Sequence, residues 1–136
     1  KNGTNGDETA LTVAGNGDVA GRHGTYHESS DSRLKNSIVT ISNALTKVEA
    51  LRGVNYKWNK PNHITEARIG LISQEVEAVV PEVIFTQVEK YINDSDEEEV
   101  GIKSIQYPNL VGLLVEAIKE LSSKNKALEA RVTALE

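Results

Sequence analysis

The last part of the sequence constrains the fold most, because it carries a continuous heptad pattern. After Pro108 no further proline follows, and the only glycine is Gly112. Apolar side chains recur at alternating steps of three and four residues, the spacing of a coiled-coil seam. The a positions are Val111, Ile118, Asn125 and Val132, and the d positions are Leu114, Leu121, Leu128 and Leu135. The pattern predicts a long helix over about residues 109–136 that pairs with copies of itself.

Charged residues beside this seam predict the direction of pairing. Lys124 and Arg131 occupy g positions, and Glu129 and Glu136 occupy e positions. In a parallel, in-register assembly each g residue meets an e residue of the neighbouring chain, so both contacts are attractive. β-Branched residues at a with leucine at d favour a two-stranded coiled coil, and a three-stranded one is also compatible with the pattern. As far as Leu121, packing of the stripe on the chain's own domain explains the pattern equally well; beyond it the other faces are too polar for a core.

The front of the chain predicts a thin β segment. Residues 1–30 hold most of the ten glycines, a density that no helix tolerates. Residues 10–13 alternate apolar and polar side chains, residues 15–18 have turn chemistry, and residues 19–21 begin another extended piece. Such a segment buries little by itself, so we expect it to be stabilised by pairing with copies of itself.

The middle of the chain predicts a small α/β domain. Leu34, Ile38, Ile41, Leu45 and Val48 form the apolar stripe of an amphipathic helix, which Gly53 ends. The elements predicted after it are strands at 54–58 and 68–72, a short helix from Ser73 to Pro81, and a hairpin pairing 83–85 with 102–105. The predicted class is therefore α+β: a short β stalk, a small α/β domain with a β-hairpin, and a long C-terminal helix.

Composition excludes several classes of function. The net charge is −5 and no basic stripe with interleaved aromatics appears, which argues against nucleic-acid binding. There is no cysteine, which excludes disulfides and thiolate metal sites, and no run is long enough to span a membrane. There is also no methionine, even at position 1, so we expect a piece of a longer protein. The scattered His23, His27 and His63 and the acidic run of residues 94–99 lack metal-site spacing, and no metal or cofactor is expected.

Ser30 and Lys35 form a candidate nucleophile–base pair where the β segment meets the first predicted helix. Serine becomes nucleophilic when a neutral amine accepts its proton, and burial or nearby positive charge lowers the pKa of an amine. Lys35 would lie near the positive end of the helix dipole, close to Arg33, with its side chain reaching back to Ser30. The competing interpretation is structural, because serine and aspartate before a helix are common N-caps.

The segment from Ser30 to Lys35 (S-D-S-R-L-K) resembles the S-D-x-R-L-K signature of the intramolecular chaperone domain of peptidase family S74. This family is found at the C-termini of phage endosialidase tailspikes, tail fibres and neck appendages. Further resemblances follow in the same order, with Ser73 where the family usually has alanine. They lie at residues 44–48, 51–58, 69–76, 81–83, 107 and 114–121. The resemblance covers residues 30–136.

The resemblance implies a homotrimer that folds the fibre before it and then releases itself as a single-turnover serine endopeptidase. Ser30 and Lys35 would be the dyad, and the cut would lie between Ser30 and Asp31. Residues 1–30 would then be the fibre tip and residues 31–136 the released chaperone. The candidate helpers are His27, Arg33, Gln74 and Glu75.

The resemblance also implies where the protein acts. It would be made in the cytoplasm of a bacterial host, where its own upstream fibre is both folding client and substrate. The fibre would then enter the virion tail without its chaperone. Two points stay open. Ser30 cannot readily attack its own carbonyl, because the ring would have four members, so a cut after Ser30 needs a water molecule or a neighbouring protomer. Attack on the carbonyl of Ser29 is easier in geometry and would cut before Ser30. The alternative is a purely structural trimerisation cap without proteolysis.

Overall fold

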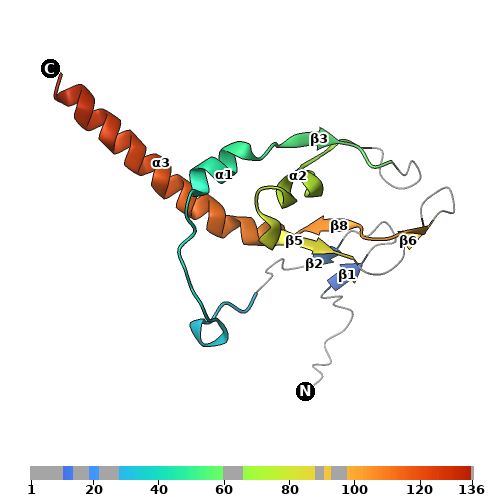
Figure 1. Ribbon diagram of the computed structural model, residues 1–136. Coiled ribbons are helices and arrows are strands. Elements are labelled where there is room, and N and C mark those ends of the chain that lie inside the picture. Colours follow the sequence, from blue (N-terminus) through green and yellow to red (C-terminus); the bar gives the residue numbers. More distant parts are fainter. Residues whose placement is uncertain are drawn as a thin grey trace.

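The predicted α+β class is confirmed by the computed structural model, in which small antiparallel hairpins precede one long helix (Figure 1). The structure describes residues 11–13, 19–21, 28–59, 66–87, 91–92 and 98–135. Within the glycine-rich front, β1 (Leu11–Val13) pairs antiparallel with β2 (Val19–Gly21), with Leu11 opposite Gly21. The predicted pair of short strands is therefore present, and the two strands pair with each other.

The first helix is much shorter than predicted. A 3-10 turn, η1 (Ser32–Leu34), and the helix α1 (Ala44–Ala50) are the helical parts of the segment for which a continuous helix was expected. Between them lie residues 35–43, which we call the strap. Ser37 and Asn43 in the strap have φ angles of 52° and 54°, a left-handed conformation that interrupts a right-handed helix. The prediction of one helix through to Gly53 was wrong.

The strap is not helical, for two physical reasons. Residues 38–41 are all β-branched, which favours extended backbone, and the serine and asparagine residues beside them compete for backbone hydrogen bonds. In addition, the predicted apolar stripe has no core to pack on within one chain. Leu34 and Ile38 are 72% and 71% exposed, whereas Leu45 at the far end of the stripe is buried.

Two further hairpins carry the middle of the chain. The strands β3 (Val54–Tyr56) and β4 (Arg68–Gly70) pair antiparallel, with Asn55 opposite Ile69. The predicted hairpin is formed by β5 (Ile84–Thr86) and β8 (Lys103–Ile105). Between them in the chain, β6 (Tyr91–Ile92) pairs with β7 (Glu98–Glu99). The short helix α2 (Ser73–Glu77) ends before η2 (Pro81–Val83), as the proline predicted.

A small aliphatic core joins the helices. After η3 (Tyr107–Asn109), helix α3 runs over Leu110–Thr133, and α1 packs against its front half. Figure 1 shows the second half of α3 extending away from the other described elements. The buried side chains come from α1, α2, η2 and α3 and the turn before η2. They are Ala44, Leu45, Val76, Val80, Val83, Leu110, Leu113 and Ala117.

A carboxylate from α3 holds the first turn of α1. The Oε1 and Oε2 atoms of Glu120 accept hydrogen bonds from the backbone N–H groups of Ala44 and Leu45, both at 2.9 Å. Asn43, at the N-cap position, makes no side-chain capping bond. Glu120 therefore satisfies two donors that the start of a helix leaves unpaired, and it fixes the start of α1 on α3.

The two N–H donors hold the pKa of Glu120 below its ordinary value of 4.5, the bond from Leu45 contributing most. A carboxylate whose pKa falls on folding adds stability above its unfolded pKa and loses it as the pH falls through the folded pKa. We expect Glu120→Gln to lower the Tm by a few degrees at neutral pH. The difference from wild type should shrink as the pH falls below about 4.5, as thermal unfolding at several pH values would measure.

Glu116→Gln is the matched control. Glu116 lies on the same helix and pairs only locally, with the Lys119 ammonium at 2.7 Å. Exposed ion pairs of this kind contribute little, so its Tm should stay near that of wild type. Equal losses in the two variants would contradict the capping role of Glu120.

Candidate functional site

Ser30 and Lys35 are in contact in the structure. The Lys35 ammonium donates a hydrogen bond of 2.7 Å to the Ser30 Oγ atom, across five residues of sequence. The turn η1 between them makes this possible, because Leu34 and Lys35 donate their N–H groups to the carbonyl oxygens of Asp31 and Ser32 at 3.0 Å and 3.1 Å. The chain therefore reverses over a few residues and brings the lysine side chain back to the serine.

Asp31 closes the turn. Its Oδ1 accepts from the backbone N–H of Arg33 at 2.8 Å and from Nε of the same arginine at 3.0 Å, while Oδ2 accepts from Nη2 at 2.7 Å. The side-chain bond from Arg33, followed by the backbone bond, lowers the pKa of Asp31 below its ordinary value. Asp31 is thus the N-cap of η1, which is the role that the structural interpretation of this motif predicted.

The surroundings of the pair differ from those expected from the sequence. Lys35 follows a turn of three residues and not the start of an α-helix, so a helix dipole does not act on its amine. The cation of Arg33 is paired with Asp31. Every residue from 28 to 43 is exposed in the single chain. The structure thus provides the contact between serine and lysine, and the burial that the chemistry requires is absent from one copy of the described segment.

The other candidate helpers do not join this pair. Glu75 forms an ion pair with Arg52, which lowers the pKa of the Glu75 carboxyl through its side-chain hydrogen bond. Gln74 is exposed at the start of α2. Among the described residues, no hydrogen bond connects Gln74 or Glu75 with Ser30 or Lys35. His27 lies outside the described residues.

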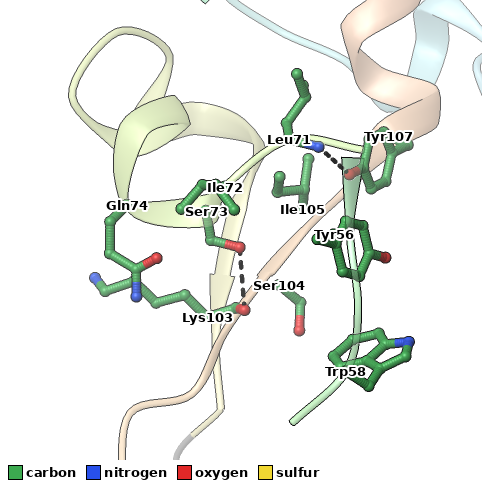
Figure 2. A pocket seen from close by; sticks show the side chains of 10 residues that line it. All are labelled: Tyr56, Trp58, Leu71, Ile72, Ser73, Gln74, Lys103, Ser104, Ile105 and Tyr107. Atoms are coloured by element: carbon green, nitrogen blue, oxygen red, sulfur yellow. Dashed lines mark hydrogen bonds between the residues drawn. The ribbon is translucent and has the colours of Figure 1, made fainter. Parts of the chain in front are cut away.

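A groove of about 440 Å³ opens between the two central hairpins. Figure 2 shows Tyr56 and Trp58 along one side of it and the strand β8 along the other. The Tyr56 and Trp58 rings meet edge to face at 5.4 Å. The Ser73 hydroxyl donates to the Lys103 carbonyl at 3.2 Å, which ties α2 to β8. The lining is largely aromatic and aliphatic and suits contacts with apolar groups.

Gly70 and Tyr107 shape the end of this groove. The Tyr107 hydroxyl accepts a hydrogen bond from the Leu71 N–H at 2.9 Å. A Cβ atom on Gly70 would lie 2.7 Å from that hydroxyl oxygen and 3.2 Å from Cε1 of Tyr56. A side chain at position 70 therefore clashes with the tyrosine that holds β4 near η3.

The seam residues of α3 are exposed, and a different face of the helix forms the core. Leu110, Leu113 and Ala117 are buried. The apolar seam side chains are between 46% and 87% exposed: Val111, Leu114, Ile118, Leu121, Leu128, Val132 and Leu135. Asn125, in the middle of the seam, is also exposed. Because neighbouring helix positions differ by about 100°, the two apolar faces lie side by side on α3. The chain's own domain does not use the seam, even in the front half of the helix.

Glu120 is the structural residue that sequence reasoning missed. Its partners lie 75 and 76 residues earlier in the chain, so local spacing carries no sign of the contact. An acidic residue in the middle of an amphipathic helix normally indicates a solvated face. Tyr107 and Gly70 belong to blocks that the family resemblance had already singled out, and the structure now gives the physical reason for their pairing.

Comparison with known proteins confirms the family resemblance. Residues 30–85 match the Peptidase_S74 family, described as chaperone of endosialidase. The match begins at Ser30, the residue whose hydroxyl contacts Lys35. The matched segment thus includes the turn at Ser30 and the elements from α1 to the start of β5.

The relatives are phage fibre proteins. The chain is 36% identical over 107 residues to the long tail fiber protein Gp37 of Enterobacteria phage K3, and the match covers 76% of this chain and 8% of that protein. The figures for Gp37 of Enterobacteria phage T2 are 36%, 76% and 7%. Gp37 of Escherichia phage AR1 is 29% identical over 96 residues. The chain thus spans a small fraction of each relative, and the matches support a chaperone role connected with a phage fibre.

Two further kinds of feature are absent from the described residues. No helix there is both long enough and apolar enough to cross a membrane. Within the same residues, no group of three or more histidine, cysteine, aspartate or glutamate side chains is arranged to hold a metal ion.

Gly70→Ala should destabilise the domain by about 1 kcal/mol or more, because the added Cβ displaces the Tyr107 hydroxyl from its hydrogen bond. Gly53→Ala is the control, since its added Cβ meets nothing within 4 Å. Tyr107→Phe removes the clashing oxygen, so in the double variant the cost of Gly70→Ala should be smaller. Urea unfolding of wild type, Gly70→Ala, Tyr107→Phe and the double variant measures this coupling. If the two losses of stability simply add, the proposed clash is contradicted.

Proposed function

We propose that this chain is the intramolecular chaperone of a phage fibre. Three copies would associate through a parallel coiled coil of α3 and hold the fibre ahead of them in register while it folds. Residues 31–136 would then leave by self-cleavage beside Ser30, and residues 1–30 would stay with the fibre. The observation that carries the proposal is the exposed seam of α3, because the apolar face expected to join copies is not used within one chain.

The energetics of the seam support association. Burying a Val, Leu or Ile side chain contributes about 1.5–3 kcal/mol relative to leaving it in water. One chain exposes six such side chains along a single stripe of α3, and Leu135 just after the helix continues the stripe. The charges at the g and e positions favour the parallel, in-register arrangement, which would bring the three front domains to the same end. The heptads alone favour two strands. The resemblance to the chaperone family implies three, and the proposal takes three.

The contact between Ser30 and Lys35 supports self-cleavage. In such a pair the neutral amine accepts the serine proton as Oγ attacks a carbonyl carbon, and the proton later passes to the departing nitrogen. The 2.7 Å contact has the required reach. Both side chains are exposed in one chain, so packing of the three copies would have to shield them from water. A cut after Ser30 would use a water molecule activated by the pair, or a neighbouring copy's serine. In the second case the ester formed between the Ser30 carbonyl and the neighbour's Oγ would then be hydrolysed by water.

A trimerisation cap that stays attached is the second candidate. It is favoured by the capping geometry of Asp31, which accounts for part of the Ser30–Lys35 motif without chemistry. In that case the hydrogen bond between Lys35 and Ser30 only stabilises the turn. The two candidates share the coiled coil and differ in whether the chain is cut.

Self-cleavage is tested by incubating the assembled chain and analysing it under denaturing conditions. We expect wild type to yield a fragment that begins at Asp31, whose mass identifies the cut bond. Ser30→Ala and Lys35→Ala should slow the cut by roughly a thousandfold or more, because each removes one half of the pair.

The other outcomes separate the alternatives. A wild-type chain that assembles and stays whole supports the attached cap and rules out the protease. Equal cutting of wild type and both variants points to a protease of the expression host.

The seam is tested by a matched pair of substitutions on α3. Leu121→Glu places a carboxylate in the seam, whereas Ser123→Glu places the same charge two residues away and outside it. Burying an unpaired carboxylate is costly, so Leu121→Glu should weaken association by about 100-fold or more. Ser123→Glu should keep the wild-type mass in sedimentation equilibrium. If both variants assemble like wild type, the seam does not join the copies.

A further inference from the structure

The turn that joins Ser30 to Lys35 contains three hydrogen bonds between Arg33 and Asp31. We infer that Arg33 is a positioning residue for the proposed self-cleavage: it holds the Asp31 carboxylate in the turn and balances the charge of that carboxylate, which follows Ser30 directly in the chain. The inference rests on the proposed function and adds a residue that does not itself touch the reacting atoms. Three hydrogen bonds of 2.7–3.0 Å from Arg33 to one carboxylate carry it.

The first part of the inference concerns geometry. Residues 28–43 are all exposed, so no core side chain of the same chain fixes their conformation. What holds the turn is local: the bonds from Arg33 to Asp31 and the two backbone bonds that close η1. The distance between Lys35 and Ser30 therefore depends on this turn, and Arg33 supplies both a backbone and a side-chain part of it.

The second part concerns charge. The described charged groups of this exposed segment are Glu28, Asp31, Arg33 and Lys35. A carboxylate near an amine favours the protonated ammonium, which cannot accept a proton from serine. Asp31 directly follows Ser30, and its charge would oppose the chemistry if it stood alone. The fork of Arg33 places a cation on that carboxylate through two side-chain bonds, one to each oxygen.

This assignment changes the role given to Arg33. In the sequence, Arg33 was expected to act on Lys35 directly as a nearby positive charge. In the structure its guanidinium faces Asp31 instead. Its effect on the amine is thus indirect, by cancelling a negative charge and not by adding a free positive one. The two roles predict different behaviour when Asp31 is neutralised together with Arg33.

The test is the rate of self-cleavage of the assembled chain as a function of pH. In Arg33→Gln the Asp31 carboxylate stands alone, so the rise in rate with pH should shift upward by about one unit. The rate at neutral pH should then be about tenfold lower. Arg33→Lys keeps the cation but loses the fork, so its midpoint should lie near that of wild type. In the double variant Asp31→Asn/Arg33→Gln both charges are absent, and the pH midpoint of the cleavage rate should return to that of wild type.

Arg52→Gln is the matched control. It removes another arginine–carboxylate pair, with Glu75, that lies outside the turn. We expect its cleavage profile to match that of wild type. Sedimentation of every variant shows whether the copies still associate, which separates a loss of assembly from a loss at the turn.

The outcomes distinguish this inference from the proposed function. If wild type assembles without being cut, the proposed function fails and this inference fails with it. If wild type is cut and Arg33→Gln has the same rate and midpoint, only the inference is wrong. A uniform loss of rate in Arg33→Gln without a shift in midpoint overturns the charge balance, because holding the turn would by itself act equally at every pH. If the pH midpoint of cleavage in Asp31→Asn/Arg33→Gln stays above that of wild type, the charge balance is contradicted.

Discussion

The packing of α1 against the front half of α3 is the interaction on which the other features depend. It buries Ala44 and Leu45 against Leu113 and Ala117, and Glu120 fixes the first turn of α1 from the same helix. Because this contact occupies one face of α3, the adjacent apolar face remains exposed. The same contact also sets where the strap leaves the body of the domain, and hence where the turn with Ser30 and Lys35 begins (Figure 1).

Features that depend on local patterns were predictable from the sequence. The long helix, the hairpin of β5 and β8, and the end of the α2 region before Pro81 each follow from spacing or from backbone chemistry over a few residues. The reach of Lys35 back to Ser30 was also expected from the length of its side chain. In each case the local sequence favours the conformation that is observed, and tertiary contacts do not change it.

Features that depend on distant partners were not predictable. The stripe from Leu34 to Val48 has helical spacing, but a stripe forms a helix in water only when something covers it, and only its end at α1 reaches the core. The expected helix dipole at Lys35 was lost with that helix. Glu120 gave no signal because its partners are far away in the sequence. The choice between own-domain packing and an open seam likewise needed the structure, since both faces of α3 are apolar.

The spacing between Ser30 and Lys35 has a consequence for the direction of the reaction. If the bond after Ser30 is the one that breaks, the hydroxyl stays with the fibre and the amine departs with the chaperone. The two halves of the pair then lie on separate molecules, and neither product keeps the means to rejoin the chain. The step would therefore be irreversible. Each fibre would be released once, and a freed chaperone could neither cut nor rejoin another chain.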